Sequence, residues 1–101
     1  MTDDSYRFLF DHDIELDDAE MSLHLAIFAV EGLFGQARVR LDAGYALDPE
    51  RHALVIDATT EVGAHLVRIF TGLLVREFGE ESFRVEHVLS SPQEPCEPAA
   101  A

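Results

Sequence analysis

Carboxylates crowd the start of the chain and give it its first candidate chemistry. Eight of the first twenty residues are acidic, opposed by a single arginine. Asp11, Asp13 and Glu15 alternate along the chain, and hard cations such as Ca²⁺ and Mg²⁺ bind oxygen-rich runs of this kind. The run departs from a calcium loop, because Leu16 stands at the turn-glycine position and Ser22 at the position of the bidentate glutamate. We therefore predict no metal centre and keep these three carboxylates as weak cation candidates.

Two of the histidines provide a second candidate chemistry. His24 and His65 occupy the polar stripes of the two long helical segments. If these helices are neighbours, the two rings meet and form a zinc or acid–base pair with Glu20 or Glu31. One alternative function is therefore a small enzyme whose site lies at a subunit interface and uses His24 and His65, or the acidic edge described below.

Other catalytic patterns are missing from the sequence. It contains neither the Gly-x-Ser-x-Gly elbow of a serine nucleophile nor a glycine-rich phosphate loop. Cys96 precedes Glu97, and negative neighbours make a thiol a poorer nucleophile by raising its pKa. We predict no catalytic residue and no cofactor.

Hydrophobic patterning predicts the elements that position these residues. Residues 6–10 are strand formers. Asp17 is expected to cap a helix, with Glu20 three residues later completing a capping box, and Gly35 to stop that helix near residue 34. Residues 37–47 alternate between apolar and polar or small side chains, which is typical of a half-buried strand.

The second half of the chain continues in the same way. Thr59 or Thr60 is expected to cap a second helix, and Gly79 to end it. The remaining predicted elements are a turn over residues 48–51, a strand over 53–57, a helix reaching about residue 78 and a strand over 83–89.

The resulting order of elements, β-α-β-β-α-β, predicts an α+β domain of the ferredoxin-like kind. We expect a four-stranded antiparallel sheet in the order 4-1-3-2 with two helices on one face. The predicted domain covers residues 5–89, between a frayed N-terminus at 1–4 and a disordered, acidic, proline-rich tail at 90–101.

Strand alternation divides the predicted sheet into two faces. The side chains expected to face the helices are Tyr6, Phe8, Phe10, Val39, Leu41, Leu54, Ile56, Phe83 and Val85. The open face is expected to combine an apolar centre with charged residues, as interfaces commonly do. Its candidate interface residues are Leu9, Arg38, Arg40, Val55, Arg84 and Val88.

One edge of this fold is expected to be strongly acidic. The end of the first strand, the hairpin tip and the loop before the last strand meet there, gathering Asp11, His12, Asp13, Glu15, Asp48, Glu50, His52, Glu80 and Glu81. A block of like charge repels its own kind and attracts a partner of opposite charge. A second alternative function is therefore an acidic protein that binds a basic protein partner.

The first helix supplies the favoured prediction of function. Between Met21 and Gly35, the only residues that are charged or titrate near neutral pH are His24 and Glu31. Its apolar residues cover more of its circumference than one sheet can bury. We therefore expect a homodimer or one dedicated protein partner. The favoured function is a small non-enzymatic association module of regulatory, adaptor or ligand-sensing type.

Composition narrows the range of partners. The 101 residues carry a formal charge of −13, which opposes binding to nucleic acid or to an anionic membrane surface. No apolar run is long enough to span a bilayer, and the acidic N-terminus lacks the basic region of a signal peptide. We expect a cytoplasmic protein with no nucleic-acid or membrane partner.

Overall fold

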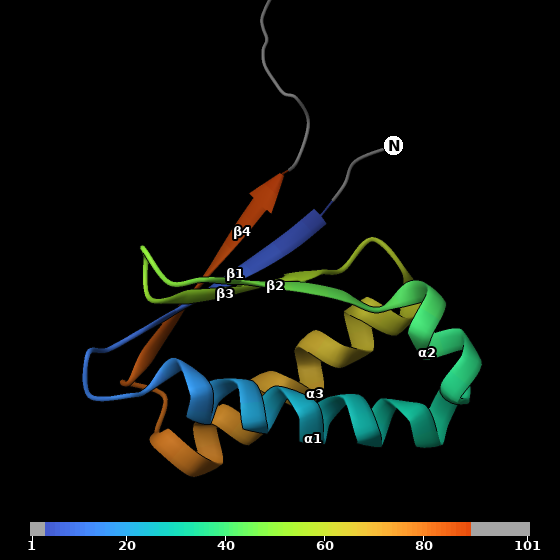
Figure 1. Ribbon diagram of the computed structural model, residues 1–101, viewed down its shortest axis with the longest axis horizontal. Helices are drawn as coiled ribbons and strands as arrows, with labels where there is room; N and C mark the ends of the chain where they lie inside the picture. Colours follow the sequence, from blue (N-terminus) through green and yellow to red (C-terminus); the bar gives the residue numbers. More distant parts are fainter. Residues whose placement is uncertain (1–3, 90–101) are drawn as a thin grey trace, which may run out of the picture.

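The computed structural model describes residues 4–89 as an α+β arrangement in which α1 and α3 lie on one face of a sheet (Figure 1). The elements in chain order are β1 (Asp4–Phe10), α1 (Leu16–Phe34), α2 (Gln36–Asp42), β2 (Gly44–Asp48), β3 (Ala53–Asp57), α3 (Glu61–Phe78) and β4 (Phe83–Leu89). Asp4, which was expected to be frayed, begins β1. Residues 1–3 and the predicted tail at 90–101 lie outside the described residues.

The sheet has four strands in the order β2-β3-β1-β4, and every neighbouring pair is antiparallel. This is the predicted order, 4-1-3-2, read from the other edge. Phe8 of β1 stands opposite Leu54 of β3 and Val85 of β4, so these side chains share one face. The next register position along β1 places Leu9 opposite Ala53 and Arg84 on the other face.

The hydrophobic core lies between the sheet and the two long helices. Phe8 is fully buried and makes an edge-to-face contact with Phe70 of α3, with ring centroids 4.9 Å apart. Most predicted inward positions are confirmed, but Val85 is exposed because it lies on an edge strand. The core residues are Phe8, Phe10, Ile14, Ala19, Leu23, Ala26, Val30, Val39, Leu54, Ile56, Val62, Leu66, Phe70, Leu74 and Phe83.

The predicted strand over residues 37–47 is wrong in its first half. Residues 36–42 form the short helix α2, and only Gly44–Asp48 form a strand. Alanine, arginine, glutamine and leucine favour a helix, and the period-two pattern did not outweigh them. Arg38 reinforces the helix through its bond to Asp42, four residues on, and also reaches Glu61. Leu41 is consequently exposed on α2.

The helix ends show which local sequence signals were sufficient to predict where a helix begins or stops. The Thr60 hydroxyl accepts a hydrogen bond from the Gly63 amide at 3.0 Å, which confirms Thr60 as the cap of α3. Gly35 and Gly79 adopt positive φ and end α1 and α3 as predicted. The expected Asp17 cap is wrong, because α1 begins at Leu16 with Glu15 as its N-cap and without a side-chain cap bond. Asp17 instead lies in the first turn.

Membrane-spanning helices are not found in this part of the chain. Within residues 4–89, no helix has the length and apolar character needed to cross a bilayer.

Alanine substitutions at two glycines inside α3 are expected to change stability in opposite directions. A Cβ at Gly63 would lie 2.0 Å from the carbonyl oxygen of Asp57, whereas a Cβ at Gly72 meets no atom within 4 Å. Gly63→Ala should therefore lower the free energy of unfolding by about 2–3 kcal/mol, because backbone must move. Gly72→Ala should raise it by roughly 0.5–1 kcal/mol, because alanine favours a helix. Urea unfolding checks both variants, and equal effects would contradict this packing.

Candidate functional site

Several large apolar side chains of α1 are exposed to solvent. The exposed fractions are 66% for Met21, 58% for Leu25, 75% for Phe28 and 64% for Leu33. Met21, Leu25 and Phe28, spaced four and three residues apart, lie on the side opposite the buried residues of the same helix. Leu33 follows Phe28 by five residues, which turns it to the side of the buried residues, where it is exposed near the end of the helix. We call Met21, Leu25 and Phe28 the α1 stripe.

The helix α1 is unusual because its buried side and the opposite, exposed side are both apolar. Ala19, Leu23, Ala26 and Val30 pack into the core, so the stripe is additional to the surface that the fold itself buries. Three neighbouring apolar residues on one helix side form a continuous patch, which is typical of an interaction site. The exposed fractions agree with the surplus apolar surface that the sequence predicted for this helix.

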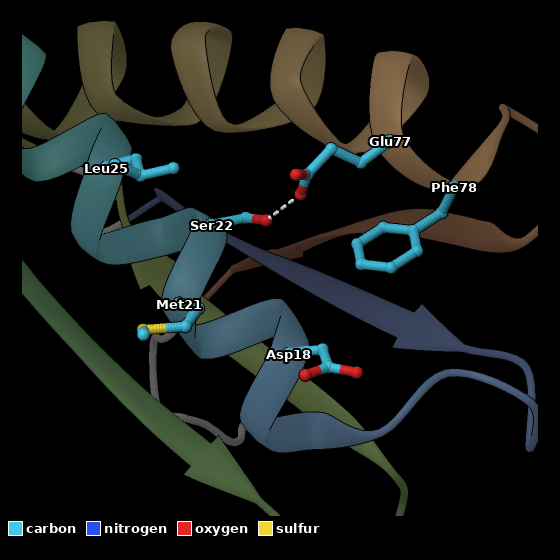
Figure 2. Close-up of a pocket in the computed structure, with 6 residues that line it drawn as sticks. All are labelled: Asp18, Met21, Ser22, Leu25, Glu77 and Phe78. Atoms are coloured by element: carbon cyan, nitrogen blue, oxygen red, sulfur yellow. Dashed lines mark hydrogen bonds between the residues drawn. The ribbon is translucent and has the colours of Figure 1, made fainter.

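A cleft separates the first turns of α1 from the end of α3 (Figure 2). It has a volume of about 530 Å³ and is lined by Asp18, Met21, Ser22, Leu25, Glu77 and Phe78. Figure 2 shows the carboxylates of Asp18 and Glu77 on opposite sides of it, with Met21, Leu25 and Phe78 supplying apolar walls. Two residues of the stripe thus also line a site that carries negative charge.

Ser22 closes the inner side of this cleft. Its side chain is 2% exposed, and its hydroxyl donates a hydrogen bond to the Glu77 carboxylate. The bond joins residues 55 positions apart and holds Glu77 toward α1. Sequence reasoning missed this pair; the one available signal was a serine on the apolar side of the helix.

The acidic edge is assembled largely as expected. The Asp11 amide donates to the Ser82 carbonyl at 2.9 Å, and the Phe10 amide donates to the His52 carbonyl at 3.1 Å. These bonds join the β1 end to the loop before β4 and to the hairpin. Asp11, Asp13 and Glu15 are exposed, and no three residues of the described segment 4–89 form a group that could hold a metal ion.

The open sheet face is less charged than expected. Leu9 and Val55 lie there and are half-buried, while Arg84 is exposed. Val88 also lies there and is half-buried. Arg38 and Arg40 were placed on this face wrongly, because both lie on α2.

One further arginine lies on the open face and is already paired. Arg7 donates to the Glu86 carboxylate at 3.0 Å from the neighbouring strand. The open face therefore keeps the predicted apolar centre but has fewer cations, and the α1 stripe is the more exposed apolar surface.

His24 and His65 have different neighbours, contrary to the expected pair. His24 Nε2 lies 3.3 Å from the Tyr45 hydroxyl, which donates to Glu20 at 3.3 Å. His65 Nδ1 lies 2.9 Å from the Glu61 carbonyl oxygen, and its ring meets that of Phe34 edge to face. No interaction joins the two histidines within residues 4–89.

Glu20, His24 and Tyr45 form a polar contact between α1 and β2. Partial burial is the main cause that raises the pKa of Tyr45 above 10.0, and the charge and hydrogen bond of Glu20 raise it further. This contact forms the polar border of the α1 stripe on the β2 side of the helix.

Comparisons with protein-family models, with curated proteins and with solved structures find no match to this chain.

The raised pKa of Tyr45 predicts a loss of stability at high pH. A phenol whose pKa is higher in the folded state stabilises that state below its ordinary pKa of 10.0 and loses this contribution as pH rises through the folded pKa. The unfolding free energy should therefore fall more steeply as pH rises above 10.0 in the natural chain than in Tyr45→Phe. Urea unfolding at each pH measures this, and parallel curves would refute it.

Proposed function

We propose that this chain is a small non-enzymatic association module that forms a homodimer through the α1 stripe. The proposal rests on one observation, the exposure of Met21, Leu25 and Phe28 along one side of a single helix. Burying such side chains stabilises a complex by about 25 cal/mol per Å² of apolar surface removed from water. Twofold symmetric pairs are the commonest oligomers of soluble proteins, and one apolar helix face serves both subunits of such a pair.

The finer assignment of the fold belongs to the same proposal. Four antiparallel strands in this order, with α1 and α3 on one face, support the ferredoxin-like arrangement. The helix α2 is then an addition between the first long helix and the second strand. In this arrangement the helical layer offers its outer side to a second copy and the sheet keeps its open face.

Charge sets the conditions under which the homodimer forms. Each chain carries −13 formal charges, so two copies repel each other at low ionic strength. Salt screens this repulsion, whereas it leaves apolar burial intact or strengthens it. We expect the dimer to tighten as salt is raised.

The acidic edge supports a second candidate, an acidic protein that binds a basic protein partner. The exposed carboxylates of Asp11, Asp13 and Glu15 lie beside the loop that carries Glu80 and Glu81. Such a surface attracts a cationic partner. Neutralising Asp11, Asp13 and Glu15 would abolish binding of that partner and leave a homodimer through the α1 stripe intact or tighter, which separates the two candidates.

Phe28→Glu should break the homodimer. It places a charge in the stripe at its most exposed residue, and we expect the dissociation constant to rise by about a hundredfold or more. Val85→Glu is the matched control, because Val85 is also an exposed apolar residue but lies on the β4 edge of the sheet. Sedimentation equilibrium measures both. A dimer that resists Phe28→Glu would refute the assignment of the interface.

A further inference from the structure

The cleft between α1 and α3 has the lining that a guanidinium group requires. Its two carboxylates, Asp18 and Glu77, take the charge, and Met21, Leu25 and Phe78 cover an aliphatic stem. Within residues 4–89, neither carboxylate forms an ion pair, and the polar partner of Glu77 is the Ser22 hydroxyl. The cleft therefore holds negative charge that residues 4–89 leave uncompensated.

The arginines divide into those already paired and those that are free. Arg7, Arg38 and Arg51 each bind a carboxylate within the described part of the chain. The exposed arginines that form no ion pair with the residues described are Arg40, Arg68, Arg76 and Arg84. A second copy must supply one of these four if it is to fill the cleft.

The geometry of α1 selects among them. α2 lies at one end of α1, and the end of α3 with the cleft lies at the other (Figure 1). Asp18 precedes Phe28 by ten residues, which is about 15 Å along the helix axis. Consider a second copy whose α1 runs antiparallel to the first and crosses it at Phe28. The α2 of the second copy, ten residues beyond its own Phe28, then lies at the same end as the cleft of the first copy.

We infer that Arg40 of the second copy enters the cleft between Asp18 and Glu77, and that the two α1 helices are antiparallel. This inference rests on the proposed homodimer and adds its orientation. Arg40 lies on α2 and is exposed, and its neighbour Arg38 is already held by Asp42 and Glu61.

The other free arginines fit the cleft less well. Arg84 lies on the open sheet face, away from the helices. Arg76 is next to Glu77 in α3, so an antiparallel copy carries its own Arg76 to the opposite end. Arg68 lies near the middle of α3. The twofold rotation that relates the two copies therefore keeps it away from either end of α1.

Antiparallel pairing also brings a cation to the acidic start of α1. The first turn of α1 carries Asp17 and Asp18. In the pair, Arg40 of the second copy lies near these carboxylates, and its charge opposes their repulsion from the carbonyl end of the other α1. Each dimer contains two such contacts by symmetry, so one substitution alters both contacts and its effect on the dissociation constant is doubled in free energy.

Charge reversal tests this arrangement. Arg40→Glu should raise the dimer dissociation constant by about tenfold at about 0.15 M salt, because two contacts are lost and replaced by repulsion. Arg84→Glu is the matched control, since it changes the net charge by the same amount on the open sheet face. Combining Arg40→Glu with Asp18→Arg should restore the dissociation constant to within about threefold of the natural chain.

The possible outcomes separate the inference from the proposed function. Weakening by Arg40→Glu but not by Arg84→Glu, with recovery in the double variant, supports the cleft contact. Equal effects of the two single variants, in a dimer that Phe28→Glu still dissociates, overturn the contact and leave the homodimer standing. A natural chain that stays monomeric at the same concentration overturns both.

Discussion

The structure depends on one imbalance: α1 is apolar on two opposite sides, and its own fold covers one of them. The inner side packs Leu23, Ala26 and Val30 into a core shared with the sheet and α3. The outer side leaves Phe28 three-quarters exposed, with Met21 and Leu25 beside it. A helix that is apolar all round is normally buried all round. This uncovered apolar side is the observation from which we propose that α1 pairs with a second copy.

In the proposed homodimer, charge favours one orientation of the two helices. Acidic residues gather where β1 ends, where α1 begins and where α3 ends, and the free arginine Arg40 lies beyond the far end of α1. Apolar contact alone would allow many orientations of two helices. A cleft with two carboxylates at one end and a cation at the other favours a single antiparallel pairing. The same acidity makes the pairing dependent on salt.

Much of the fold follows from local signals, and the failures have identifiable causes. Strand alternation located Phe8 and Leu54 in the core, and Thr60 marked a helix start through a bond that it makes locally. The strand expected at residues 37–42 failed because good helix formers alternated there by chance, so period and propensity disagreed. The α1 stripe was foreseeable from apolar spacing. The cleft was not, because the Ser22–Glu77 bond joins distant segments that only the packing of α1 on α3 brings together.

The mass of the natural chain in solution tests the central claim most directly. Light scattering behind a sizing column, in low salt and again in about 1 M salt, reports whether α1 pairs. The account predicts a species of twice the 11.3 kDa chain mass that becomes more populated as salt is raised. A monomer at tens of micromolar in both buffers would contradict it and would assign the α1 stripe to a different protein.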